Sequence, residues 1–185
     1  MAFDLGNLLN QYLGGAMGAN QQQAHDDFDR VAQNAPPDVL ARGVTGALRS
    51  DQTPPFPQMV SQMFGQSNPN QRAGMLNQLL ATLGPTVLAS LANRGGGGLG
   101  GLGGLGGLGG LFSGGNAPTQ VTPEQASQVS PEAVRELAEK AEQENPSIVD
   151  RMGDFYAQNP TLVKAIGGAA LAIALGHMAQ NMRRQ

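Results

Sequence analysis

The chain has 185 residues, enough for one domain or two small ones, and hydrophobic residues make up 40% of it. Its net charge is −3, and both residues 1–94 and residues 117–185 carry more acidic than basic groups, which argues against a nucleic-acid partner. Cysteine is absent, which excludes disulfides, thiolate metal sites and a cysteine nucleophile, and fits a reducing cytoplasm as well as an exported protein.

Residues 1–15, MAFDLGNLLNQYLGG, predict a short amphipathic helix. Its apolar side chains share one side: Phe3, Leu5, Leu8, Leu9 and Leu13. Asp4 stands where a signal peptide would carry Lys or Arg, and polar residues interrupt the apolar run, so a cleaved signal is not expected. We therefore predict a cytoplasmic protein, with peripheral attachment to or insertion into the inner membrane as the alternative.

A capping residue followed by proline recurs along the chain and indicates where helices begin. The pairs are Asn68-Pro69, Thr122-Pro123, Ser130-Pro131, Asn145-Pro146 and Asn159-Pro160. The cap side chain accepts from a free backbone N–H, and proline fits the next position because no hydrogen bond is needed there.

The spacing of apolar residues predicts the helices themselves. It predicts them at about 26–33, 37–49, 57–65, 69–83 and 85–93, with Gly84 ending the fourth. Further helices are predicted to begin at Pro123, Pro131, Pro146 and Pro160. No segment alternates apolar and polar residues as a strand would, so the predicted fold class is all-α.

Residues 95–115 read GGGGLGGLGGLGGLGGLFSGG, with leucine at every third position from Leu99 to Leu111. We interpret residues 95–116 as a flexible linker, because glycine loses the most backbone entropy on ordering. A polyproline-II-like rod with its leucines along one edge is the alternative. The predicted organisation is thus two small helical units, 1–94 and 117–185, joined by a Gly/Leu-rich linker.

No pattern in the sequence predicts catalysis. Residues 98–103 match the dinucleotide pattern GxGxxG, but no strand precedes them, and a Gly-Gly-Leu repeat produces that match by itself. His25 and His177 lie far apart, and we interpret the aspartates beside His25 as an acidic helix start. We therefore expect no enzyme, no cofactor and no metal site.

Residues 122–142, TPEQASQVSPEAVRELAEKAE, resemble a helix-turn-helix in their rhythm. Residues 122–144, however, contain six Glu against Arg135 and Lys140, a net charge of −4 that would repel phosphates. A helical hairpin inside a bundle is favoured, and DNA binding through 122–142 is a distant alternative.

Residues 161–182, TLVKAIGGAALAIALGHMAQNM, form the most apolar segment and predict a final helix. Small residues recur along it at every fourth position: Gly168, Ala172 and Gly176. Such a stripe lets another helix approach closely. A buried central helix is favoured, and membrane contact is the alternative, although Arg183 and Arg184 argue against a tail anchor.

Two segments carry a resemblance to known proteins. They are TPPFPQMVSQMFGQSNPNQRAGMLNQLLATLGP (53–85) and NPSIVDRMGDFYAQNPTLVKAIGGAALAIALGHMA (145–179), separated by a glycine-rich stretch. Together they resemble an uncharacterised family of small bacterial helical proteins, and their helix rhythm is similar to that of the YidB-like proteins. The resemblance implies a bacterial source and an all-α fold, and it carries no catalytic residue over to this chain.

We expect a non-catalytic structural or protein-interaction protein that forms a homo-oligomer or binds a protein partner through apolar helix faces. The candidate contact residues are the small-residue stripe and the paired aromatics of the C-terminal part: Gly168, Ala172, Gly176, Phe155 and Tyr156.

Overall fold

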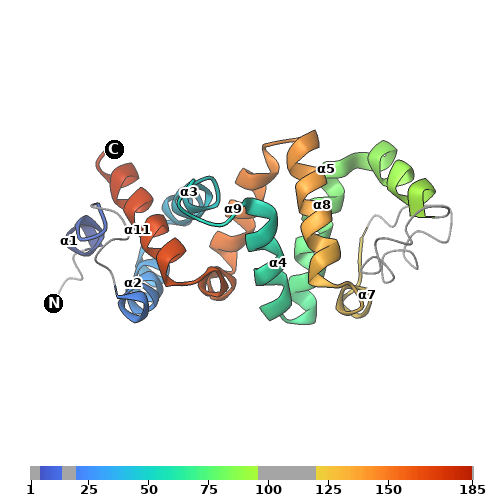
Figure 1. Ribbon diagram of the computed structural model, residues 1–185. Helices are drawn as coiled ribbons and strands as arrows, with labels where there is room; N and C mark the ends of the chain where they lie inside the picture. Colours follow the sequence, from blue (N-terminus) through green and yellow to red (C-terminus); the bar gives the residue numbers. More distant parts are fainter. Residues whose placement is uncertain (1–4, 14–19, 96–119, 185) are drawn as a thin grey trace. The chain divides into compact units, whose positions relative to one another are not determined.

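The computed structural model describes residues 5–13, 20–95 and 120–184, and every regular element in these ranges is a helix (Figure 1). The predicted all-α fold class is therefore confirmed. The predicted linker, 95–116, lies outside the described residues except for Gly95, the last residue of α5 (Pro69–Gly95).

Helix packing divides the chain into two compact units: unit 1 comprises Met1–Pro55 and Val149–Gln185, and unit 2 comprises Phe56–Ile148. This grouping differs from the predicted boundaries, because 1–94 and 117–185 each contribute helices to both units. The reason lies in which helices pack together. α11 (Gly168–Met182) packs on α3 (Pro37–Leu48), whereas α8 (Pro131–Glu144) packs on α4 (Phe56–Gln66).

Unit 1 is built around α11. Its elements are α1 (Leu5–Asn10), α2 (Gln21–Asn34), α3 (Pro37–Leu48), α9 (Ile148–Gln158, from its second residue), α10 (Pro160–Val163), a 3₁₀ turn (Lys164–Ile166) and α11 (Gly168–Met182). α11 packs most extensively on α3, and also on α2 and α1 (Figure 1). A helix that is apolar on nearly all sides needs such covering, and α11 is buried at almost every position up to Ala179.

α3 shows why these two helices approach so closely. Its apolar residues Val39, Leu40, Val44 and Leu48 are buried, as their spacing predicts. Gly43 lies on the same side, and a Cβ there would overlap the Met178 side chain of α11. The small residue thus leaves room for a long side chain from the other helix.

The prediction of one continuous helix over 161–182 is wrong. The chain forms α10, a 3₁₀ turn and then α11, and the break lies at Gly167, whose φ of 91° and ψ of 158° are not helical. Glycine adopts this backbone conformation without the clash that a Cβ would cause. The helix that remains has 15 residues, about 22 Å at 1.5 Å per residue.

Unit 2 contains α4 (Phe56–Gln66), α5 (Pro69–Gly95), α7 (Pro123–Ser127) and α8 (Pro131–Glu144). α8 packs on α4 and α5, and α7 packs on α5. The side chain of Asn77 ties α5 to the segment before α7, since it accepts from the main-chain N–H of Val121 at 2.7 Å. α5 changes direction at Gly84, where φ is 68°, which confirms the predicted end of the helical run at this glycine.

The predicted capping residues act as caps at three of the helix starts. Asn68 accepts from the main chain of Gln71, Thr122 forms a capping box with Gln125, and Ser130 accepts from Ala133. At Asn159 the side chain instead donates backward to the carbonyl of Phe155, and α10 has no side-chain cap.

Candidate functional site

The small-residue stripe of α11 lies inside unit 1. Gly168 and Gly176 are buried, and Ala172 is 1% exposed. A Cβ on Gly176 would meet the main-chain carbonyl oxygen of Tyr12 at 2.8 Å, and its other neighbour within 4 Å is the carbonyl carbon of Tyr12. At Gly176, the close approach therefore occurs within the chain, between α11 and the turn that follows α1.

The segment around α1 is held on α11 and α2 by two buried side chains. Leu9 is 1% exposed and Tyr12 is 3% exposed. The Tyr12 hydroxyl donates a hydrogen bond of 2.7 Å to Oδ2 of Asp27, a carboxylate in α2 that is itself buried. We call the surface of α11 and α2 that receives this segment the α1 seat, and it includes Gly176 and Asp27.

The environment of the Tyr12 hydroxyl disfavours its ionised form. Burial raises the pKa of Tyr12 well above its usual range, and the hydrogen bond to the Asp27 carboxylate and the charge of that carboxylate raise it further. Arg30 lies 3.7 Å from the other carboxylate oxygen of Asp27, with its own side chain largely exposed. The buried phenol therefore stays protonated and serves as a hydrogen-bond donor.

The apolar stripe of α1 is wider than the α1 seat. Leu5, Leu8 and Leu13 belong to the predicted apolar side of this segment, yet all three are half-buried, whereas Leu9 beside them is buried. We call these three residues the outer leucines. They leave apolar surface of unit 1 in contact with water.

The predicted aromatic pair lies on α9. The rings of Phe155 and Tyr156 are arranged edge to face, with centroids 5.7 Å apart and planes at 66°. Tyr156 is fully buried, and its hydroxyl has no hydrogen-bond partner among the described residues, so burial raises the pKa of this phenol. Phe155 is half-buried. Of the five predicted contact residues, Phe155 is thus the one with a side chain partly open to solvent.

Two of the aspartates beside His25 contact other segments of unit 1. Asp27 accepts from Tyr12, and Asp29 forms an ion pair of 2.5 Å with Lys164. In the described ranges, no group of three or more His, Asp or Glu side chains is placed to hold a metal ion.

The segment predicted as a helical hairpin forms α7 and α8 of unit 2. The exposed side of α8 carries carboxylates, with Glu132, Glu139 and Glu144 exposed beside Arg135 and Lys140. This surface presents negative charge where a recognition helix would present basic and amide groups.

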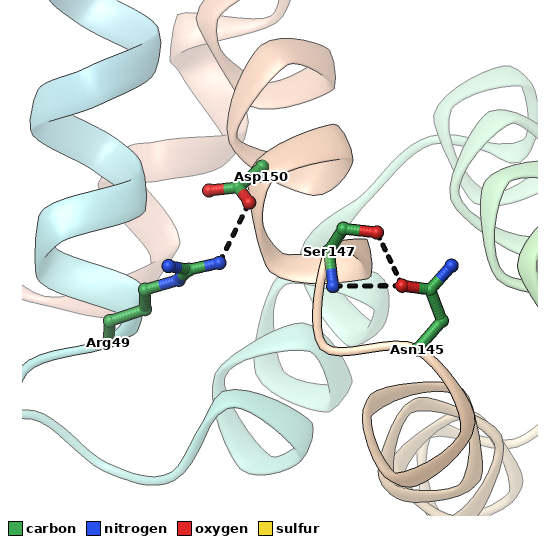
Figure 2. Close-up of polar contacts among 4 residues, drawn as sticks. All are labelled: Arg49, Asn145, Ser147 and Asp150. Carbon is green, nitrogen blue, oxygen red and sulfur yellow. Dashed lines mark hydrogen bonds and ion pairs between the residues drawn. The ribbon is translucent and has the colours of Figure 1, made fainter.

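Figure 2 shows two groups of polar contacts at helix ends. In unit 1, Nη2 of Arg49 lies 2.7 Å from Oδ2 of Asp150, and both side chains are about half exposed, at 50% and 53%. In unit 2, Oδ1 of Asn145 accepts from the main-chain N–H of Ser147 at 3.1 Å and also from its hydroxyl. The Asn145 contacts fix a turn of the chain, whereas the Arg49–Asp150 pair joins the end of α3 to the start of α9, and all of these groups are open to solvent.

Within the part of the chain that the structure describes, no helix combines the length and the hydropathy needed to cross a bilayer.

The α1 segment with its outer leucines is the candidate site, and sequence reasoning found part of it. The apolar side of the first helix was predicted, but the hydrogen bond between Tyr12 and Asp27 was not, because nothing in the spacing of these residues points to a pair. No protein-family model matches the chain, and comparison with curated proteins and with solved structures also finds no match.

Proposed function

We propose that this chain is a non-catalytic structural or interaction protein that associates with a second copy of itself through the outer leucines. The observation that carries the proposal is the unequal burial of the α1 segment. Leu9 and Tyr12 hold it on unit 1, while Leu5, Leu8 and Leu13 keep apolar surface in water. Covering this surface is favourable, at roughly 25 cal/mol per Å².

A second copy is the partner that fits this surface most simply. Homodimers mostly have twofold symmetry, so the same patch meets itself, and an apolar stripe is complementary to an identical stripe. The proposal moves the contact from the predicted stripe at Gly168, Ala172 and Gly176, which is buried, to the adjoining α1 segment.

The surrounding features are compatible with association rather than with DNA binding. The acidic side of α8 disfavours a phosphate backbone as partner. For the location we propose the cytoplasm, with which the absence of cysteine from the sequence is compatible.

The test replaces two outer leucines in the full-length chain, as the double variant Leu8→Gln/Leu13→Gln. Each half-buried leucine is expected to contribute about 1 kcal/mol to association, so the double variant should weaken the dimer ~30-fold. Sedimentation velocity over a concentration series measures the dissociation constant. Gln11→Ala, at an exposed polar position of the same segment, is the matched control and should leave that constant unchanged.

A parallel measurement separates self-association from membrane attachment. The wild type is sedimented with vesicles of anionic phospholipid, because half-buried leucines on an amphipathic helix also favour a lipid surface. The proposal expects the protein to stay in the supernatant as a dimer. An unchanged dissociation constant in the leucine variant, or a monomeric wild type that sediments with vesicles, contradicts it.

A further inference from the structure

Unit 2 interrupts the sequence of unit 1. The chain leaves unit 1 after Pro55, forms unit 2 from Phe56 to Ile148, and returns to unit 1 at Val149. Unit 1 is therefore built from two segments that are far apart in the sequence, whereas unit 2 is one continuous segment. One domain can interrupt another in this way when the points at which the chain leaves and returns lie close together, because the interrupted core then stays intact.

In unit 1, the points of departure and return are held together by side chains. Nη2 of Arg49, directly after α3, lies 2.7 Å from Oδ2 of Asp150, the third residue of α9 (Figure 2). The Thr53 hydroxyl donates to the carbonyl oxygens of Ala47, at 2.6 Å, and Ser50, at 2.8 Å, which fixes the departing segment on the end of α3. The chain thus leaves and re-enters unit 1 at neighbouring positions.

α9 also packs closely on α3. A Cβ on Gly153 would overlap Oγ1 of Thr45 and would lie 3.2 Å from the carbonyl oxygen of Ala41. Gly153 and Ala41 are both buried. The packing of α11 on α3 joins the same two segments a second time. Residues of unit 1 therefore connect its two segments through a core of their own.

In unit 2, the two ends of the continuous segment lie together as well. A Cβ on Gly65, near the end of α4, would lie 3.6 Å from Cγ of Pro131, the first residue of α8. Because α4 and α8 pack along each other, they are antiparallel, and the start of α4 lies beside the end of α8 (Figure 1). All four helices of the unit contribute fully buried side chains to its core, among them Met63, Leu79, Ala126 and Val134.

We propose that unit 2 is an independently folding domain inserted between α3 and α9 of unit 1, so that either unit can unfold while the other stays folded. Each unit has its own buried core, and each brings the two ends of the insertion together by its own contacts. Parts of a chain with separate cores open as separate cooperative units. Since the outer leucines belong to unit 1, self-association through them does not require unit 2.

Two matched variants of the full-length chain test the insertion. Leu171→Ala in α11 and Leu79→Ala in α5 each shorten a leucine that is 0% exposed. Amide hydrogen exchange, read by mass spectrometry peptide by peptide, reports the opening of each unit separately. Leu171→Ala should speed the slow exchange of α3 at least ~30-fold and leave α4 and α8 at the wild-type rate. Leu79→Ala should speed α4 and α8 and leave α3 and α11 unchanged.

The result that overturns the proposal is acceleration of both units by either variant, since a shared core would then open as one. Complete unfolding of unit 2 by Leu79→Ala with α3 and α11 still protected supports it, whereas loss of all protection contradicts it. Val44→Ala in unit 1 and Val60→Ala in unit 2 are a milder pair, both at buried positions, and should give the same pattern with smaller accelerations.

The consequence for self-association rests on the proposed function and has its own measurement. Sedimentation velocity of Leu79→Ala should give the dissociation constant of the wild type. If the dimer weakens while α3 and α11 stay protected, the insertion stands and the proposed contact surface is wrong. If the dimer depends on the outer leucines but Leu79→Ala speeds exchange in both units, the proposed function stands and the insertion is wrong.

Discussion

Gly43 of α3 lies directly against the side chain of Met178 in α11, so that a Cβ on residue 43 would overlap the Met178 Cγ. The next close approach along the same helix is at Gly46, where a Cβ would lie 2.6 Å from Cγ of His177. Two residues of α3 thus accept two consecutive side chains of α11, and they join segments from distant parts of the sequence. The core of unit 1 depends on these small residues.

Replacing Gly43 with alanine should destabilise unit 1 by about 1–3 kcal/mol, because the added methyl group overpacks a filled core. Alanine has a higher helix propensity than glycine, so a loss of stability would be due to packing and not to helix propensity. Urea unfolding followed by circular dichroism measures the change.

Gly65→Ala in α4 is the matched control for this substitution. Its Cβ would lie 3.6 Å from Pro131, an ordinary contact, and the variant should be as stable as the wild type or slightly more so. Equal stability of Gly43→Ala and the wild type would contradict the close packing of α3 on α11.

Gly167→Ala should cost about 1–3 kcal/mol for a different reason. Nothing lies within 4 Å of the position of a Cβ at Gly167, but φ of 91° with ψ of 158° is a conformation that essentially glycine alone adopts. Thermal unfolding measures the loss, with Ala169→Gly at an exposed position of α11 as a comparison for helix propensity. A stable Gly167→Ala variant with increased helix content would indicate that 161–182 forms one helix after all.

The two tyrosines of the chain predict how stability changes at alkaline pH. The ordinary pKa of tyrosine is about 10, and the pKa values of Tyr12 and Tyr156 are raised in the folded state, mainly by burial. The unfolded chain therefore releases these protons first. Stability is fully present below about pH 10 and is lost as the pH rises from there toward the folded pKa values.

Tyrosinate absorbance and circular dichroism, followed together, measure this linkage. Tyrosinate should appear together with the loss of helix, above the pH at which free tyrosine ionises. Tyr12→Phe should leave a single ionisation, that of Tyr156. Ionisation near pH 10 with the helices intact would show that neither phenol is buried.

Arg49→Ala should change the stability of unit 1 by less than about 0.5 kcal/mol. Its ion pair with Asp150 is short, at 2.7 Å, but both side chains are about half exposed, and exposed ion pairs are weakened by solvent and salt. Thermal unfolding at low and high salt measures the effect. A loss of several kcal/mol that salt does not diminish would mean that the pair contributes far more than its exposure allows.

Local features of the fold could be predicted from the sequence. The break at Gly84, followed by Pro85, and the capping box of Thr122 and Gln125 depend on residues a few positions apart. The same reasoning failed at Gly167, because a glycine inside a long apolar run is compatible with both a continuous and a broken helix.

The grouping of the helices could not be predicted in this way. The apolar faces of α3, α8 and α11 consist of similar Leu, Val and Ala residues, so their sequences do not indicate which face meets which. Gly43 and Gly46, three residues apart on α3, gave a signal of close approach like that of Gly176, and sequence reasoning overlooked them. The hydrogen bond from Tyr12 to Asp27 depends on how α1 and α2 pack against α11. No local sequence pattern predicts that packing.

The most direct test of self-association is light scattering after size exclusion on the full-length protein, purified without detergent and measured over a range of concentrations. Self-association predicts a defined mass above the 19.1 kDa of one chain, approaching two chains as the concentration rises. A mass that stays at one chain over the whole range, or aggregation that lipid or detergent alone reverses, would contradict it.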